Sequence, residues 1–231
     1  QPMLTAMRKV SALESRHDFS SETQAAWKTV QEEGKELGRC LVVIHNKALP
    51  LWIHKAEKER ISLIEKKLEN VAGEARDMIR SLRMQSLPQE QRVALQIAAE
   101  SRTDEQVELA AVAEKATSVS WETAASTLAE PQRDQAENLC LLLSDAQENY
   151  RGISSCRDVL NYDYWMAVST IASTPDGMKA RESLQRAGRA AETGDFEEAQ
   201  SAYEEGLTAL QACIMENPKL SSKAGVIEEI S

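Results

Sequence analysis

Apolar residues recur at alternating steps of three and four over two stretches of the chain, and this spacing constrains the fold more than any other feature. Such a repeat lines up apolar side chains along one helix face, as in a heptad seam. The two stretches lie on either side of Pro50 and consist of Trp27, Val30, Gly34, Leu37, Leu41 and Ile44, then Ile61, Ile64, Leu68, Val71, Ala75, Met78 and Leu82. They predict two long helices.

The turn between these helices falls at residues 46–50. The residue before a proline disfavours the α conformation, so Pro50 ends the first helix. Two seamed helices joined by a tight turn are typical of an antiparallel hairpin. We therefore predict a coiled-coil-like antiparallel helical hairpin over residues 21–86, in which the short apolar run Leu41–Ile44 continues the first helix.

The composition of the 231 residues favours helices in the rest of the chain as well. Aromatic residues make up 4%, there are 9 Gly and 6 Pro, and strand-type alternation is missing. Few helix breakers and few strand formers suit long helices. The predicted fold class is all-α: an elongated helical bundle with the coiled-coil-like hairpin and a C-terminal hairpin that resembles a tetratricopeptide repeat (TPR).

Helix-start and helix-stop signals define two further segments before the C-terminal hairpin. Residues 1–20 are expected to form a short N-terminal helix or arm. Residues 87–173 are expected to form a helical bundle with one long helix that begins after Pro131. Two alternatives remain for that helix: it runs unbroken to about Ser173, or it kinks near Gly152, because glycine lowers helix propensity.

The C-terminal segment, residues 174–231, begins with a clear helix-start signal. Thr174-Pro175-Asp176 combines a capping hydroxyl, a proline at the first helical position and an acid that favours the helix dipole. Gly194-Asp195 then turns the chain, and Asn217-Pro218 ends the second helix. Ser221-Ser222 would cap one last helix.

Residues 180–210 match one TPR unit at positions spread over both helices of this hairpin. Small residues let the two helices sit close, Gly194 permits the turn, and Phe196, Tyr203 and Leu207 are expected to fill the groove between them. The full set of matching positions is Ala187, Gly194-Asp195-Phe196, Ala199, Tyr203 and Gly206-Leu207. A repeat array needs about three units for a continuous core, so the hairpin is interpreted as a cap on a bundle.

A larger C-terminal block resembles a group of uncharacterised helical proteins of planctomycete-type bacteria. The resemblance covers roughly residues 155–230 and depends on Asn161-Tyr162-Asp163-Tyr164-Trp165, Ala180-Arg181, Gly194-Asp195, Tyr203-Glu204-Glu205-Gly206-Leu207 and Asn217-Pro218. It brings no known activity. It implies a membrane tether upstream of the chain, although no apolar run in the sequence itself is long enough for a transmembrane segment.

Charge and cysteine spacing exclude several classes of protein. The net charge is −10, and the one basic stretch, Lys55 to Lys67, is interleaved with glutamates, so we expect no nucleic acid partner. The four cysteines form no C-x-x-C pair, and Cys140 and Cys156 on one helix would lie roughly 24 Å apart. Localisation stays open, with a bacterial cytoplasmic or membrane-associated protein favoured over a disulfide-rich secreted one.

No arrangement of residues predicts a catalytic, cofactor or metal site. His45 and His54 flank the Pro50 turn, with Asn46 and Glu57 nearby, but no spacing supplies a third strong ligand. Glu14 and His17 form the single Glu-x-x-His motif, whereas a di-iron bundle needs two. Nucleotide-binding and hydrolase motifs are missing as well. We therefore predict that the protein is not an enzyme.

The aromatic cluster Tyr162, Tyr164 and Trp165 is the candidate partner-binding site. Such residues either anchor the core or form an exposed hot spot for another protein. The predicted function is a non-catalytic helical scaffold or assembly subunit within a larger complex, whose partners are other protein subunits or further copies of itself. The alternative is a helical-bundle enzyme or a metal or cofactor carrier without a recognisable motif.

Overall fold

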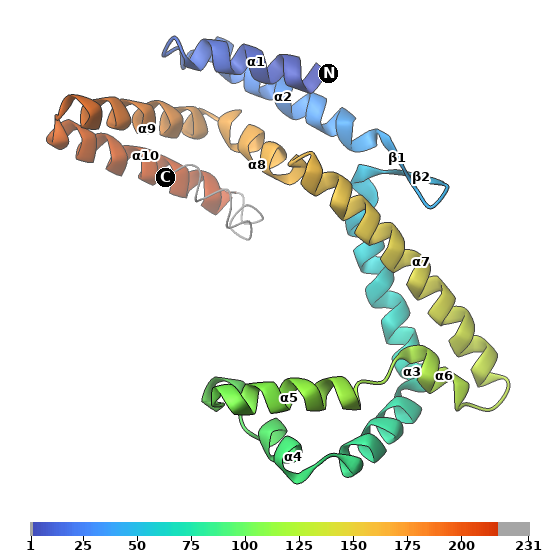
Figure 1. Ribbon diagram of the computed structural model, residues 1–231. Helices are drawn as coiled ribbons and strands as arrows, with labels where there is room; N and C mark the ends of the chain where they lie inside the picture. The colour runs from blue at the N-terminus through green and yellow to red at the C-terminus, as the bar shows by residue number, and fades with distance from the viewer. Residues whose placement is uncertain (1, 217–231) are drawn as a thin grey trace. The chain divides into compact units, whose positions relative to one another are not determined.

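The computed structural model describes residues 2–216 and shows an all-α protein (Figure 1). Within these residues there are ten α-helices, two short 3₁₀ turns and one two-stranded sheet. The chain divides into two compact units. Among the described residues, the first joins residues 2–53 with residues 152–216, and the second is His54–Arg151. This division cuts across the expected segments 21–86 and 87–173.

The first unit is built around α2 (Ser21–Arg39), which packs against α1 (Pro2–Glu14) and α8 (Tyr162–Ala172). Ser20 caps α2, and its hydroxyl accepts a hydrogen bond from the Glu22 N–H at 3.2 Å. The core between these helices contains Ala6, Val10, Ala26, Trp27, Val30, Val168, Ala172 and Met178. The first predicted seam is therefore helical in this unit up to Leu37, buried as far as Gly34 and partly buried at Leu37.

The run Leu41–Ile44 is a strand, so the prediction that it continues the helix is wrong. It forms β1 and pairs antiparallel with β2 (Lys47–Pro50), with Ile44 opposite Lys47. His45 and Asn46 between them have φ values of 46° and 67°, as a two-residue type I′ turn requires. Three β-branched residues in four, followed by a turn residue that tolerates the left-handed region, override the helical spacing. The 3₁₀ turn η1 (Leu51–Ile53) follows.

The long helix predicted after Pro131 is neither unbroken to Ser173 nor kinked at Gly152. It forms α7 (Gln132–Val159), and the left-handed Asn161, with φ of 46°, separates it from α8. Gly152 lies inside α7 where the β-hairpin approaches it. A Cβ atom there would lie 2.7 Å from Cγ2 of Ile44, so only glycine permits this contact.

The C-terminal hairpin consists of α9 (Pro175–Thr193) and α10 (Phe196–Glu216). Thr174 caps α9 through the Gly177 N–H at 3.0 Å, and Gly194 turns the chain at φ of 82°. Small side chains are buried between the helices, including Ala187, Ala199 and Ala202.

The expectation that three larger side chains fill the groove of this hairpin is wrong. Phe196, Tyr203 and Leu207 are 74%, 38% and 49% exposed, so they lie on the outer face of α10. The further helix expected after Ser221-Ser222 lies outside the described residues.

The second unit contains α3 (His54–Ser86), α4 (Gln89–Gln96), the 3₁₀ turn η2 (Ala99–Ser101), α5 (Asp104–Thr117) and α6 (Trp121–Ser126). The predicted seam of α3 is buried here at Ile64 and Leu68, and Ile61 and Val71 of the same seam are partly buried against this core. The seam packs on alanines of α6 and on alanines, Cys140 and Leu143 of the first part of α7. Up to Val71 the seam of α3 thus packs inside its own unit, whereas Met78 and Leu82 farther along it are 64% and 59% exposed. No helix in the described part combines the length and the apolar character needed to cross a membrane.

Candidate functional site

Tyr162, the first residue of the predicted aromatic site, belongs to the core. Its side chain is 8% exposed, and the Arg157 guanidinium lies 4.5 Å from the ring centroid. A Cβ atom on Gly38 would lie 2.5 Å from the Tyr162 hydroxyl, so α2 packs directly on this residue. Burial raises the pKa of its phenol, and the nearby Arg157 lowers it to a smaller extent. The suggestion that Tyr162 is exposed for a partner is therefore wrong.

Tyr164 and Trp165 are half-buried and line a groove in the first unit. Their ring centroids lie 4.9 Å apart, and the ring planes meet at 74°, the edge-to-face arrangement that aromatic pairs favour. The groove has a volume of about 590 Å³ and is formed by α1, α2, α8 and α9. Its lining consists of Leu4, Met7, Arg8, Val10, Ser11, Glu14, Ser15, Trp27, Tyr164, Trp165, Val168, Arg181 and Gln185.

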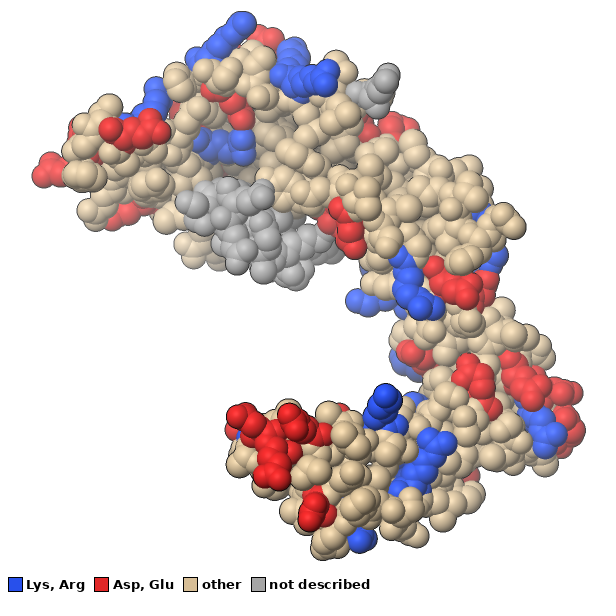
Figure 2. Space-filling model, viewed as in Figure 1, with Lys and Arg blue, Asp and Glu red and all other residues tan. Residues whose placement is uncertain are grey.

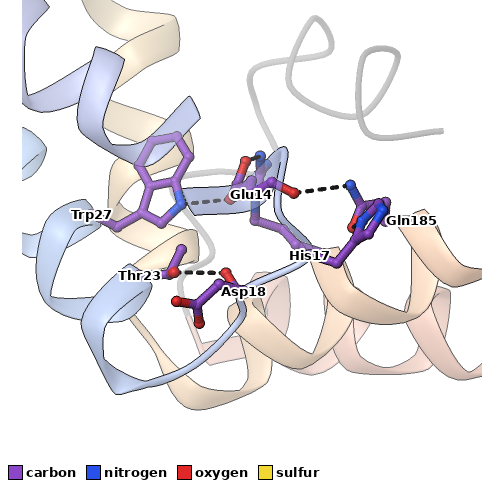
Figure 3. A network of polar contacts seen from close by, with 7 residues as sticks. Glu14, His17, Asp18, Thr23, Trp27 and Gln185 are labelled. Carbon is purple, nitrogen blue, oxygen red and sulfur yellow. Dashed lines mark hydrogen bonds and ion pairs between the residues drawn. The ribbon is translucent and has the colours of Figure 1, made fainter. Parts of the chain in front are cut away.

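Glu14 at the end of α1 holds one side of the groove together (Figure 3). Its Oε1 accepts hydrogen bonds from Trp27 Nε1 at 2.9 Å and from Arg181 Nε at 2.8 Å. Its Oε2 accepts a third from an Arg181 terminal nitrogen at 2.7 Å. Gln185 donates to the Glu14 carbonyl at 3.3 Å. The Glu14 carboxylate thereby ties the end of α1 to Arg181, which is 167 positions away in the chain.

Arg181 also stacks on the indole of Trp27, with its guanidinium carbon 4.9 Å from the ring centroid. The Glu14 side chain is 16% exposed and that of Arg181 28%, so the pair is shielded from solvent. A bidentate pair of this kind is a strong contact in such surroundings. Because both carboxylate oxygens already accept hydrogen bonds, Glu14 serves to hold the groove walls in place.

The side chains of Glu14 and His17 face different partners. The His17 Nδ1 lies 3.0 Å from Oε1 of Gln185, whereas the Glu14 carboxylate faces Arg181. Among residues 2–216, no three His, Cys, Asp or Glu side chains gather in a way that could hold a metal ion.

The two histidines near Pro50 have separate surroundings. His45 lies in the β-turn, and His54 stacks on Tyr150 with ring centroids 4.5 Å apart. Glu57, which the sequence placed near them, is buried and pairs with Arg60 at 3.3 Å. None of the four cysteines forms a disulfide bond within the described residues. None of these groups belongs to the groove.

Sequence reasoning missed the part of the groove that comes from α1. Leu4, Met7 and Arg8 line it from a segment that the sequence marked only as a short helix or arm. A signal was available, because Leu4, Met7 and Ser11 recur at steps of three and four on one helix face. Arg181 carried no local signal, since its partner is 167 positions away.

The groove is thus mainly apolar and aromatic, and its charged side chains are Arg8, Glu14 and Arg181. Such a lining is typical of a binding site for an apolar group with a few fixed polar contacts. Comparisons of the chain with protein-family models, with curated proteins and with solved structures found no match.

Proposed function

We propose that this protein is a non-catalytic helical scaffold or assembly subunit that binds another protein subunit through the groove of its first unit. The observation that carries the proposal is the half-buried pair Tyr164 and Trp165 at an apolar groove of about 590 Å³. Burial of apolar surface is the main driving force of association. Aromatic side chains and arginine dominate the energetics of protein interfaces.

The rigidity of the groove supports this proposal. Trp27 is 3% exposed and its N–H is bonded to Glu14, so one wall is fixed before any partner arrives. Tyr164 and Trp165 pack on each other, and α8, the helix that carries them, is anchored by the buried Ala167 and Ile171. A preorganised surface loses less conformational freedom on binding, which favours affinity.

The finer features expected from the sequence fit the same role. The antiparallel pair α9 and α10 would act as a TPR-like cap of the first unit, and α3 with its partners would supply a coiled-coil-like arm. The resemblance of residues 155–230 to planctomycete-type helical proteins, with its upstream membrane tether, would place such a scaffold at a membrane.

The direct test is a pull-down from the source cells with the wild-type chain and two matched variants, read by quantitative mass spectrometry. Trp165→Ala removes the aromatic side chain from the groove. Phe196→Ala removes an aromatic side chain that is 74% exposed on α10, outside the groove. We expect a stoichiometric protein partner that Trp165→Ala loses and Phe196→Ala retains. Equal recovery with both variants, at unchanged circular dichroism, would contradict the proposal.

The alternative function, a helical-bundle enzyme or a metal or cofactor carrier, is tested on the same purified protein. Absorbance between 300 and 700 nm and elemental analysis would reveal a chromophore or a stoichiometric metal. Either finding would favour the alternative over the scaffold. Light scattering on a sized sample would distinguish partner binding from self-association.

A further inference from the structure

Among the described residues that line the groove, one charged side chain has no partner of opposite charge. Glu14 and Arg181 neutralise each other, and Lys9, which follows Arg8 on α1, pairs with Glu22 at 3.4 Å. No described residue forms an ion pair with Arg8, which lines the groove and is exposed. The groove therefore presents a net positive charge, although the chain as a whole carries −10.

This positive charge lies beside the apolar part of the lining. Leu4 and Met7 are one turn or less away from Arg8 on α1, and all three line the groove with Tyr164 and Trp165. Figure 2 shows both basic and acidic side chains over α1 and α2. An arginine next to aromatic anchors can bind a carboxylate with two parallel hydrogen bonds. The arrangement selects a ligand that is apolar on one side and acidic at its edge.

The length of the groove indicates the shape of this ligand. The lining residues of α1 run from Leu4 to Glu14, which corresponds to nearly three turns and about 15 Å. A partner helix laid along α1 could place apolar residues at steps of three and four over the same distance. An acidic residue on its flank would then face Arg8.

We propose that the groove binds an acidic amphipathic helix of a partner protein, and that Arg8 selects for the acidic flank. This inference rests on the proposed function, because it names the partner chemistry of the same groove. Arg8 acts as a specificity residue, while Trp165 supplies apolar contact that does not depend on the charge of the ligand.

The test measures binding of two fluorescein-labelled 18-residue peptides by anisotropy. Both are amphipathic helices with the same leucine face, and one has glutamates on its flank where the other has lysines. The full chain is used as wild type, Arg8→Glu, Lys9→Glu and Trp165→Ala. Lys9→Glu is the matched control, because it makes the same charge change one position away, at a residue that does not line the groove.

We expect the wild type to bind the glutamate peptide about fivefold more tightly than the lysine peptide, as for an exposed ion pair. This preference should vanish or reverse in Arg8→Glu, persist in Lys9→Glu and shrink in 1 M salt. Trp165→Ala should weaken both peptides alike.

Other outcomes overturn the proposal at distinguishable levels. If neither peptide binds, the groove does not take a partner helix, and the proposed function fails with the inference. If a concentration-dependent dimer excludes both peptides, a second copy of the chain occupies the groove instead. If both peptides bind equally, or if Arg8→Glu keeps the preference for glutamate, the acidic partner is wrong while the groove remains a binding site.

Discussion

Replacing Glu14 should destabilise the first unit far more than its position near the start of the chain suggests. Glu14→Ala removes three hydrogen bonds and leaves the nearly buried N–H of Trp27 and the shielded guanidinium of Arg181 without their acceptor. A lost hydrogen bond to a charged group costs about 1.5–3 kcal/mol, and a buried unpaired donor costs about 1–3 kcal/mol. Because Arg181 is 28% exposed and can recover part of its hydration, we expect a loss of about 2–4 kcal/mol.

Urea unfolding followed by tryptophan fluorescence measures this loss. A Trp121→Phe background removes the tryptophan of the second unit, so that the signal reports on Trp27, Trp52 and Trp165 of the first. Glu22→Ala is the matched control, since Glu22 pairs with Lys9 at the surface, where such pairs contribute about 0–1 kcal/mol. A Glu14→Ala chain within about 0.5 kcal/mol of the wild type would refute the assigned role of this carboxylate, because it would then cost no more than a surface pair.

Three further changes test other parts of the structure. Gly152→Ala should cost about 1–3 kcal/mol by forcing a methyl group against Ile44, which the same urea titration would detect as a lower midpoint. Hydrogen bonds from Lys179 and Arg186 lower the pKa of Glu205 below its ordinary 4.5. The ionised Glu205 carboxylate therefore stabilises the fold above pH 4.5, and this stabilisation is lost as the pH falls through the lowered pKa. Thermal melts of Glu205→Gln should show a smaller loss of stability in acid than those of the wild type. Burial raises the pKa of the Cys140 thiol, whereas Cys40 is exposed. Iodoacetamide at pH 8 should therefore label Cys40 first and Cys140 only in denaturant, which peptide mass spectrometry would detect.

The predicted helices were confirmed where the apolar repeat is long. Trp27 and Val30, and likewise Ile64 and Leu68, are buried in helices as their spacing requires. A repeat sustained over several turns can be satisfied by one secondary structure alone, because an extended chain would turn every second apolar side chain toward water. The partners that cover each seam were not predictable, since any apolar helix face can cover another.

The secondary structure of short apolar runs depends on competing local preferences. Leu41–Ile44 fits the end of a helical repeat and also the start of a strand, and over four residues the two patterns cannot be separated by spacing. The type I′ turn at His45 and Asn46 settles the choice, because its left-handed backbone joins two strands. Asn161 likewise separates α7 from α8 at a point that lacks glycine and proline.

The candidate site was only partly predictable for a related reason. The aromatic cluster marked the correct helix, but the sequence could not say that Tyr162 faces Arg157 and the core while Tyr164 and Trp165 line a groove. That distinction depends on which neighbouring helix covers each face of α8. Arg8 belongs to the candidate site because it lines the same groove as Trp165, which is far away in the sequence.

By itself the sequence determines that this chain is helical, where its long helices carry apolar faces, and which aromatic residues are concentrated together. These properties follow from the periodicity of side chains along a single backbone, which is local information. Only the tertiary structure decides which faces meet, which of the aromatic residues stay accessible, and that Glu14 and Arg181 close one side of a groove. Those contacts join segments more than 160 residues apart, and no local pattern encodes such a pairing.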